Sequence, residues 1–344
     1  GISAVSARTY VIRRLALVVL VLFGVATLTF MIVRILPSEP AAVYLGPRPT
    51  PEQIARVNKE LGLDRPLIVQ YGVYMKNLVT GQWGSSLRTK RPVLTDIFHF
   101  MPLTLQLVLL SLVFSTVVGV SLGCVTAYLR GKRTDHVMRL FATAGVALPA
   151  FFVALLLQVI FFRILHLLPV ATSGDISVTL AHPIQTVTGL PLVDSLITGN
   201  SAAFWDNVKH TILPVLALTA YPTGVVMRMT RSSMLETLEQ DYVRMERAMG
   251  IPSRVIILKY GLKNAMAPIL TVIGLMFAYS LTGTFFIELV FSWPGLGMYA
   301  TMSLLGLDYP AIMGVTVLVA FVYVVINLIV DLVLARVDPR IVLE

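Results

Sequence analysis

Six long apolar runs dominate this sequence, and each is long enough to cross a lipid bilayer as an α-helix. They cover Leu15–Leu36, Leu103–Tyr128, Val137–Leu165, Ile212–Met229, Ala265–Leu289 and Ala311–Leu334. A hydrocarbon core about 30 Å thick needs roughly 20 mostly apolar residues in a helix. Only 13% of the 344 residues are charged, whereas soluble domains contain about 25%. The sequence therefore predicts an all-α polytopic membrane protein with six transmembrane helices.

The distribution of basic residues predicts that both chain termini lie in the cytoplasm. Lys and Arg accumulate in short loops on the cytoplasmic side of a membrane. The links between runs two and three and between runs four and five are rich in them, whereas 164–208 and 288–310 contain none. The loop 37–102 carries eight basic residues yet is placed outside, which is compatible with the rule because loops beyond about 60 residues largely escape it.

The two outer loops differ in the structure that they predict. Thr50–Gln53 reads Thr-Pro-Glu-Gln, a capping box with proline at the first helical position. Ile54 and Val57 follow at helical spacing, and Gly62 can end the helix, so a short amphipathic helix is expected there. The second outer loop, His166–Asn207, is rich in Gly, Ser, Thr and Pro and is expected to be irregular.

Motifs for several kinds of chemistry are missing from the sequence. The single Gly-Lys pair, Gly131-Lys132, is followed by Arg133 where a P-loop needs Ser or Thr. There is no His-Glu-x-x-His or Gly-x-Ser-x-Gly pattern, and the single cysteine, Cys124, allows no disulfide within the chain. We therefore expect no catalytic residue, no metal site and no cofactor in this chain.

Ionisable residues and glycines within the apolar runs are interpreted as structural, and two prolines are expected to bend their helices. Ionisable residues such as Glu288 lie near the ends of runs, where a side chain is expected to snorkel to the headgroups. Gly119 and Gly123 have the spacing that favours close helix packing. Pro149 and Pro222 are expected to kink their helices, because proline lacks the backbone N–H of a helix interior. For these two kinks a place beside a transport pathway and simple helix packing are equally good interpretations.

The segment between the fourth and fifth runs is predicted to form an amphipathic helix in water. Apolar residues recur there at spacings of three and four; they are Leu235, Leu238, Tyr242, Met245 and Met249. This stripe extends along one helix from Ser232 to Gly250, where glycine supplies a left-handed position and Pro252 prevents continuation. A second helix is expected to begin with Ser253 as its N-cap and to run into the fifth apolar run.

Two interpretations of this amphipathic helix compete. A helix with basic flanks can lie on an anionic membrane surface, or its apolar side can bind a groove on another protein. Acidic residues are mixed with the basic ones; they are Glu236, Glu239, Asp241 and Glu246. Because carboxylates are poorly suited to an anionic surface, the composition favours a protein partner.

Several motifs together resemble the inner-membrane permeases of binding-protein-dependent ABC importers. The stretch from Asp241 to Pro268, with Asp-Tyr-Val-Arg, Arg-Ala-x-Gly and Leu-Lys-Asn-Ala in order, is similar to the cytoplasmic EAA motif of that family. Further stretches resemble the first, "B", subunit of the dipeptide and oligopeptide subfamily; they are ELGLDRPLIVQY (60–71), GQWGSSLRTKRPV (81–93), RMTRSSMLE (228–236), FSWPGLG (291–297), DYPAIMG (308–314) and DPRI (338–341). Glu246 departs from that subfamily, which usually has alanine there, and we expect a local ion pair between Glu246 and Arg244 or Lys259.

The resemblance implies a type I ABC importer permease fold and a role as half of a translocation pathway in the bacterial cytoplasmic membrane. It implies a second homologous permease subunit, two ATPase subunits or domains that bind ATP and Mg²⁺, and an extracytoplasmic substrate-binding protein as partners. Membrane lipids are the other contact, and no nucleic acid is expected. The implied organisation is a first transmembrane segment at 1–36, an extracytoplasmic loop at 37–102, and a five-helix permease core at 103–344.

The resemblance also implies two sets of site residues. The ATPase-coupling loop, at about 230–264 and the helix entry that follows, would use Asp241, Tyr242, Arg244, Glu246, Arg247, Ala248, Gly250 and Pro268. The extracytoplasmic motif would use Trp293, Pro294, Gly295 and Gly297. For Trp293 an interfacial anchor is at least as good an interpretation as a gating role, because indole is favoured at membrane interfaces.

Other functions stay open from the sequence. Within the same architecture the substrate could be a dipeptide, a longer peptide, a nickel chelate, glutathione or haem. An autonomous channel or secondary carrier would predict charges inside the membrane or an inverted repeat, and the sequence displays neither. A membrane-embedded enzyme would need a catalytic constellation, which the motif search does not find.

Overall fold

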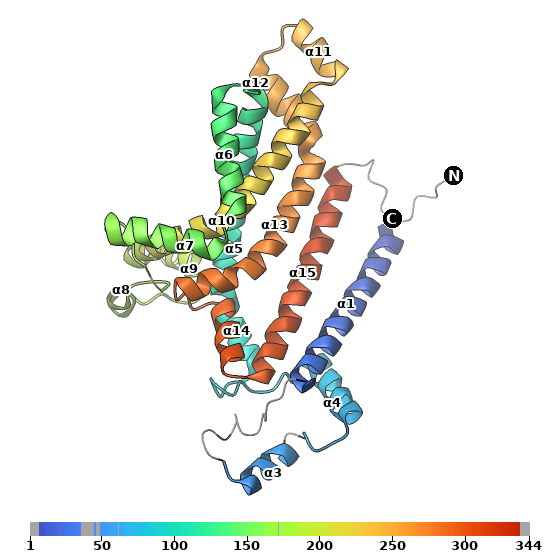
Figure 1. The fold of residues 1–344 in the computed structure, drawn as a ribbon, viewed down its shortest axis with the longest axis vertical. Helices are drawn as coiled ribbons and strands as arrows, with labels where there is room; N and C mark the ends of the chain where they lie inside the picture. The colour runs from blue at the N-terminus through green and yellow to red at the C-terminus, as the bar shows by residue number, and fades with distance from the viewer. Residues whose placement is uncertain (1–6, 36–44, 46–48, 61, 171, 338–344) are drawn as a thin grey trace. The chain divides into compact units, whose positions relative to one another are not determined.

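The structure, a computed structural model, describes residues 7–35, 45, 49–60, 62–170 and 172–337 (Figure 1). In this part of the chain the regular structure is helical, apart from one isolated antiparallel bridge between Ser85 and Pro92. The all-α prediction is therefore confirmed. The helices are α1 (Ala7–Ile35), α3 (Pro51–Glu60), α4 (Leu67–Val79), α5 (Val93–Tyr128), α6 (Arg133–Ala147), α7 (Ala150–Leu157), the π-helix η1 (Gln158–Ile164), α8 (Ile176–Ala181), α9 (Pro191–Ile197), α10 (Ser201–Leu238), α11 (Asp241–Ala248), α12 (Ser253–Val255), the π-helix η2 (Ile256–Leu262), α13 (Lys263–Val290), α14 (Leu296–Leu305) and α15 (Tyr309–Val337).

Helices that can cross a membrane account for five of the six predicted runs. They are Ile12–Arg34, Val93–Tyr128, Ser201–Leu238, Ser253–Val290 and Tyr309–Val333. Several of them extend well beyond the apolar run that predicted them, because polar residues at both ends continue the same helix.

The sixth predicted run, Val137–Leu165, is not one straight helix. α6 and α7 are separated by Leu148 and Pro149, and the pair of helices is bent by 108°. Leu148 and Pro149 are extended, with ψ angles of 133° and 139°. Pro149 cannot donate a hydrogen bond into α6, and it disfavours helical geometry at the residue before it. The expected kink is therefore a full break, and the described residues form five spans, or six if the bent pair counts as one.

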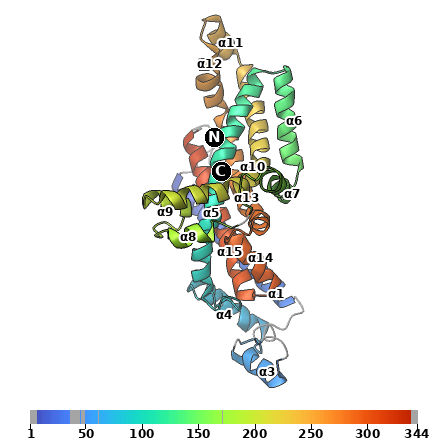
Figure 2. The same cartoon turned by 90° about the vertical axis from the view of Figure 1, so that its left-hand side faces the viewer.

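The chain forms two compact units. Unit 1 contains Pro102–Pro294 together with the end of α15 from Ile326, and unit 2 contains Arg8–Met101 and Gly295–Val325, as far as these residues are described. In unit 1, α10 is the central helix and packs against α6, α7, α9 and α13 (Figure 1, Figure 2). Its core includes fully buried leucine and isoleucine side chains from three helices, which are Leu107, Leu213 and Ile287.

Glycines bring the backbones of unit 1 close together. A Cβ atom added at Gly123 of α5 would lie 2.5 Å from Thr230 Cβ, and one added at Gly119 would lie 2.9 Å from the Val226 side chain. On another face of α10, a Cβ at Gly224 would lie 2.5 Å from the carbonyl oxygen of Ala142. The close packing predicted for Gly119 and Gly123 is therefore confirmed. Gly224 likewise allows α10 to pack closely against α6.

Unit 2 contains the predicted short outer helix. The Thr50 N–H donates to Gln53 Oε1 at 2.9 Å, and the Gln53 N–H donates to Thr50 Oγ1 at 3.3 Å. This reciprocal pair is the predicted capping box, and α3 begins at Pro51. Gly62, with a φ of +66°, follows the helix. The helix at this position is confirmed.

The second outer loop is more ordered than its composition suggests. α8 and α9 lie within His166–Asn207, and α10 already begins at Ser201, so the prediction of an irregular loop is wrong. Short polar side chains cap these helices: Asp175 accepts from the Ser177 N–H at 2.7 Å, and Asn200 accepts from the Ala203 N–H at 3.2 Å. Asp and Asn at such N-cap positions favour the start of a helix, and the overall composition of the loop does not reveal these positions.

Candidate functional site

The segment between the fourth and fifth predicted runs contains two helices where one was predicted. α10 ends at Leu238, Gln240 is extended with a ψ of 149°, and α11 starts at Asp241. α11 has an acidic residue in its first turn and Arg247 in its last turn, a charge order that complements the helix dipole. The prediction of one continuous helix from Ser232 to Gly250 is therefore wrong.

The break changes which residues of α11 are buried. Val243 is fully buried and packs with Met234, Leu238 and Ile256, whereas Met245 and Met249 are each 61% exposed. Tyr242 is 37% exposed, and its hydroxyl accepts a hydrogen bond from Asn264 Nδ2 at 2.9 Å. The two residues between the helices interrupt the helical phase, so the predicted apolar stripe splits into a buried part on α10 and an exposed part on α11.

Gly250 makes the turn that leads from α11 back to the membrane span. Its φ is +78°, the left-handed conformation predicted for this position. The Gly250 N–H donates to the Arg247 carbonyl at 3.0 Å, and the Ile251 N–H donates to the Glu246 carbonyl at 3.2 Å. A Cβ at Gly250 would meet no atom of the described residues within 4 Å. The backbone conformation, and not the available space, therefore selects glycine here.

The exit from this turn is a continuous helical segment made of α12, η2 and α13. Pro252 precedes it in the N-cap position without a side-chain cap, so the prediction of Ser253 as N-cap is wrong by one residue. Residues 256–262 form a π-helix. This helix packs closely on α10, because a Cβ added at Gly261 would lie 2.9 Å from Met234 Cε. Pro268 then lies inside α13. The helix thus connects α11 directly to a predicted span.

The charged residues of α11 form a different pairing from the predicted one. Arg244 Nη1 lies 3.3 Å from Asp241 Oδ1, and both side chains are exposed. Glu246 is 8% exposed, and its Oε2 atom has no hydrogen-bond partner among the described residues. The predicted ion pair of Glu246 with Arg244 or Lys259 is therefore not present in the described part of the chain. Ala248 lies on the exposed side of α11.

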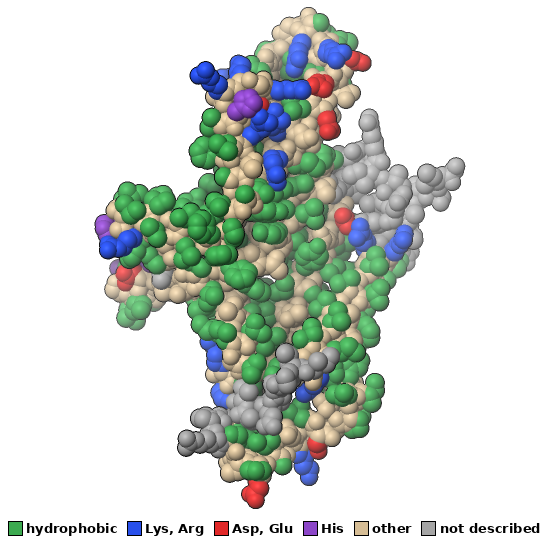
Figure 3. Space-filling view, viewed as in Figure 1, with side chains coloured by type: hydrophobic (Ala, Val, Ile, Leu, Met, Phe, Trp, Pro, Cys, Tyr) green, Lys and Arg blue, Asp and Glu red, His purple; other side chains and the backbone are tan. Residues whose placement is uncertain are grey.

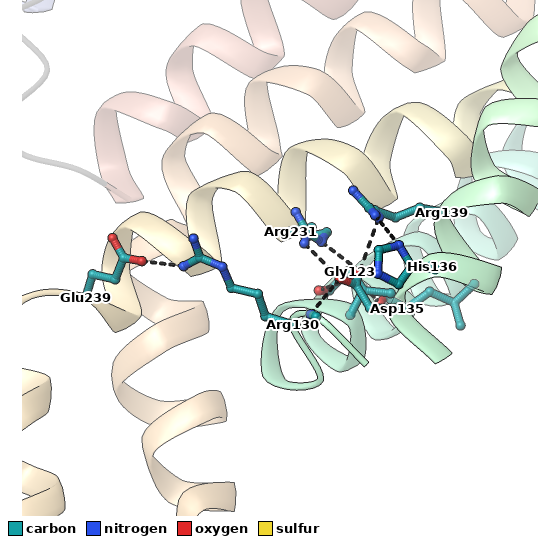
Figure 4. Close-up of polar contacts among 10 residues, drawn as sticks. Gly123, Arg130, Asp135, His136, Arg139, Arg231 and Glu239 are labelled. Atoms are coloured by element: carbon teal, nitrogen blue, oxygen red, sulfur yellow. Dashed lines mark hydrogen bonds and ion pairs between the residues drawn. The ribbon is translucent and has the colours of Figure 1, made fainter. Parts of the chain in front are cut away.

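A cavity of about 440 Å³ lies beside α11 and the ends of α5 and α10, and Arg247, Glu239 and Ser253 line it. Arg130, in the turn that follows α5, also lines the cavity and forms an ion pair with Glu239 (Figure 4). Lys and Arg side chains gather at this end of unit 1, the end that carries α6 and α11 (Figure 3). The arrangement presents charged groups and two exposed methionines around one small helix.

An ion cluster that sequence reasoning missed stabilises the same end of unit 1. Asp135 in the first turn of α6 is buried and accepts from Arg231 Nε at 3.1 Å and from Arg231 Nη2 at 3.0 Å (Figure 4). The Gly131 N–H donates to Asp135 Oδ2 at 3.1 Å, and Arg139 Nε lies 3.5 Å from Oδ1. The signal in the sequence is that Asp135 is the one acidic residue between Arg130 and Arg139.

The predicted extracytoplasmic motif is divided between the two units. In unit 1, Trp293 is fully buried, and its Nε1 donates to the Leu103 carbonyl at 3.2 Å. The interpretation of Trp293 as an interfacial anchor is therefore wrong, because a fully buried indole does not reach the headgroups. Pro294 is partly exposed. In unit 2, Gly295 is the N-cap of α14 and Gly297 is buried in its first turn.

Glu288 also contradicts its predicted role. It is fully buried in α13, and Thr104 Oγ1 donates to its Oε1 at 2.5 Å. Its expected snorkelling to the headgroups is wrong, because α13 turns this side chain toward α5 and not toward lipid. A hydroxyl donor at this position reduces the free-energy cost of a buried carboxyl.

Two of the sequence motifs meet in unit 2 although more than 200 positions separate them. Ser86 Oγ donates to Asp308 Oδ2 at 2.5 Å, and the Arg88 N–H donates to the same oxygen at 3.2 Å. A Cβ at Gly314 would lie 2.6 Å from Val93 Cγ1 and 3.2 Å from Trp83. The stretches 81–93 and 308–314 therefore form one packed structure, which sequence reasoning treated as separate motifs.

Known proteins resemble the chain over nearly its whole length. The family described as "Binding-protein-dependent transport system inner membrane component" matches residues 119–343, and the family described as "Binding-prot-dependent transport system membrane comp, N-term" matches residues 8–108. The dipeptide transport system permease protein DppB of Alkalihalophilus pseudofirmus is 41% identical over 332 residues, which are 96% of this chain and 98% of that protein.

Two further relatives extend the comparison. The probable D,D-dipeptide transport system permease protein DdpB of Escherichia coli strain K12 is 41% identical over 94% of both chains. The glutathione transport system permease protein GsiC of Salmonella typhi is 36% identical over 96% of this chain and 98% of that protein.

A solved structure shares the fold. The inward-facing MetNI methionine ABC transporter aligns with a TM-score of 0.52 at 16% identity, over 69% of this chain and 93% of that chain. Family, relatives and fold agree with one another and with the apolar helices. The chain belongs to the family of inner-membrane components of binding-protein-dependent transport systems, and it is a multi-pass permease of the inner membrane.

Proposed function

We propose that this chain forms half of the translocation pathway of an ATP-driven importer of dipeptides or oligopeptides. Relatives of this chain with the highest identities quoted above are named as dipeptide permeases. The observation that carries the coupling part of the proposal is α11, a short helix that a left-handed glycine joins to a membrane span, with an exposed methionine in the helix and a second, Met249, at its C-cap. Such a helix suits docking into a groove of another protein.

In this proposal, the site of ATP hydrolysis lies outside this chain. Without a P-loop, the chain would receive force from two ABC ATPase subunits or domains, which would bind ATP and Mg²⁺. A second homologous permease would supply the other half of the pathway, and a binding protein would deliver the substrate. This chain would then need no cofactor or catalytic residue of its own.

The proposed coupling residues have separate tasks. The exposed Met245 and Met249 and the charged Asp241, Arg244 and Arg247 would contact the ATPase. Tyr242 would hold α11 through its hydrogen bond with Asn264, with Glu246 buried on the same helix, Ala248 at the contact edge and Gly250 setting the direction of the turn. The segment Ser253–Val290, with Pro268 inside it, would carry the displacement into the membrane, as alternating access requires.

The proposed orientation places α11 and both chain termini in the cytoplasm, as the distribution of Lys and Arg favours. The motif with Trp293, Pro294, Gly295 and Gly297 would then lie toward the binding protein. The buried Trp293 would act by supporting the packing between α5 and α13, and not by anchoring to headgroups. We keep the division into 1–36, 37–102 and 103–344 as the proposed functional organisation.

Uptake by the reconstituted complex tests this function. The complete complex in proteoliposomes, with the binding protein outside and ATP inside, is expected to accumulate a labelled dipeptide. Omission of the ATPase subunits is expected to abolish accumulation. Uptake by the isolated chain without ATPase subunits would contradict the proposal.

Glutathione is the second candidate substrate, because a glutathione permease is 36% identical to this chain. Competition separates the two: excess unlabelled dipeptide, but not excess glutathione, is expected to reduce the dipeptide signal. ATP-dependent uptake of glutathione without uptake of any dipeptide would move the assignment to the second candidate.

A further inference from the structure

Unit 2 contains a cavity of about 580 Å³ at the C-terminal end of α1, which we call the α1–α4 pocket. Its walls come from α1, the loop 62–65, α4, the stretch 81–93 and the first two turns of α15. The Phe30 ring of α1 stacks on the Tyr74 ring of α4, with 5.6 Å between the ring centroids. The centroid of the Tyr71 ring, also on α4, lies 5.4 Å from that of Phe30. A hydrogen bond of 2.7 Å between Thr27 and Tyr71 also joins the two helices. The pocket is therefore built by a packed pair of helices.

Three polar side chains that line the α1–α4 pocket have a buried atom for which no described residue provides a hydrogen-bond partner. These atoms are Arg34 Nε, Gln70 Oε1 and the Tyr74 hydroxyl oxygen. The amide nitrogen of Gln70 donates to the carbonyls of Leu63 and Arg65 at 3.0 and 2.7 Å, which fixes the side chain. Buried polar groups are nearly always paired, so three unpaired ones around one cavity indicate a missing ligand.

The charge of the pocket indicates that this ligand is an anion. Arg34 and Arg65 line it, and none of its described lining residues is Asp or Glu. The Arg34 guanidinium lies 5.4 Å from the centre of the Phe30 ring. Burial, and then the neighbouring Tyr71, raise the pKa of Tyr74 to about 12, so its phenol stays protonated and can donate. Two guanidinium groups and a phenol suit a phosphate, which accepts several hydrogen bonds.

The surroundings of the pocket indicate that the anion belongs to a lipid. Arg34 is the last residue of the span Ile12–Arg34. Phe30 and Arg34 line the pocket, while Leu28 and Ile32 of the same turns are 61% and 58% exposed on the apolar outside of the helix. In an inner-membrane protein these exposed side chains contact acyl chains, so phospholipid headgroups occur at the level of the pocket.

We propose that the α1–α4 pocket binds the phosphate headgroup of a membrane phospholipid. Arg34 and Tyr74 donate to the phosphate oxygens, Arg65 adds positive charge, and Gln70 Oε1 accepts from the ammonium or hydroxyl group of the headgroup. The apolar wall that includes Phe30 and Trp83 contacts the first part of the acyl chains. The site is independent of the transported substrate, so its test does not depend on the proposed function.

Native mass spectrometry of the full-length chain tests the proposal. The chain, purified in its complex and exchanged into mild detergent, is titrated with phosphatidylglycerol and, separately, with phosphatidylethanolamine. Arg34→Gln and Tyr74→Phe are each expected to weaken the tightest lipid-binding event about 10-fold or more, because each removes a donor to a charged phosphate. Tyr74→Phe removes a single oxygen and keeps the ring stacking, so it remains informative if Arg34→Gln fails to assemble.

A matched variant controls for indirect effects. Lys76→Gln removes an exposed positive charge from the same helix, outside the pocket lining. It is expected to bind lipid as the wild type does. Equal lipid binding by Arg34→Gln, Tyr74→Phe, Lys76→Gln and the wild type would overturn the proposal, as would filling of the pocket by another part of this chain. Displacement of the lipid by millimolar inorganic phosphate would also overturn it, because a soluble anion would then be the ligand.

Discussion

Gly250 offers the sharpest test of how α11 is connected to the membrane span. A residue other than glycine at a φ of +78° is forced into the left-handed region, which costs about 1–2 kcal/mol for an L-residue. Within the described part of the chain a new Cβ would meet no atom within 4 Å, so no clash adds to this strain. By the relation between free energy and population, the native turn would become roughly 5- to 30-fold less populated relative to its alternatives.

We therefore expect Gly250→Ala to lower the number of peptides imported per ATP hydrolysed, by up to that factor. The conformation and not the size of the side chain should decide the order of effects. Gly250→Asn is expected to be mildest, because asparagine adopts the left-handed region more readily than other residues, and Gly250→Val is expected to be most severe. Uptake and ATP hydrolysis are measured together in proteoliposomes that contain the complete complex.

Gly199 provides the matched control. It also has a positive φ, of +68°, and open space around it, but it precedes α10 in a different loop. Gly199→Ala is expected to introduce comparable strain while the coupling ratio stays at the wild-type value. An unchanged ratio in Gly250→Val, or an equal loss in Gly199→Ala, would refute the assignment of Gly250 as the hinge of the coupling helix.

Three further predictions concern separate parts of the molecule. Asp135→Ala is expected to lower the free energy of unfolding by about 3 kcal/mol, because it leaves Arg231 largely buried without its carboxylate; thermal unfolding measures this. The double variant Asp135→Leu/Arg231→Met also removes the unpaired charge, so a double variant that is no more stable than Asp135→Ala would contradict the prediction. Met245→Ser is expected to weaken ATPase binding about 10-fold or more without changing thermal stability, since the side chain is 61% exposed; unchanged co-purification of the ATPase would contradict a docking role. Burial alone would raise the pKa of Asp194, but hydrogen bonds from the Thr188 side chain and from three backbone N–H groups outweigh it and lower the pKa from 3.8. The folded-state pKa is thus below the unfolded one, so Asp194 contributes stability above pH 3.8 that is lost as the pH falls through the folded pKa. Hydrogen exchange in α9 is expected to rise in that range, and Asp194→Asn should remove the pH dependence.

Local chemistry in the sequence was sufficient for much of the fold and for part of the candidate site. The apolar runs identified the spans, because only long uninterrupted helices place so many apolar residues in a bilayer. The capping box at Thr50 and the left-handed turn at Gly250 are present as predicted. Each of these features depends on residues that are neighbours in the chain, so the sequence alone is sufficient to predict it.

Burial of particular side chains was decided only by the tertiary structure. In a membrane protein, residues that face lipid and residues that face other helices are equally apolar, so hydropathy does not separate them. Glu288 was therefore expected at the headgroups, and an interfacial anchor was one of two interpretations of Trp293, whereas both side chains are fully buried and hydrogen-bonded to α5.

The coupling segment combines both kinds of information. The sequence by itself determined that a short amphipathic helix and a left-handed glycine lie between two spans. Packing determined that the helix is separate from α10 and that Val243, and not Met245 or Met249, is buried. The two residues between α10 and α11 interrupt the helical periodicity. The spacing of apolar residues alone therefore does not predict which face of α11 packs against the neighbouring helices. Likewise, Ser86 and Asp308 meet only because the fold brings distant segments together.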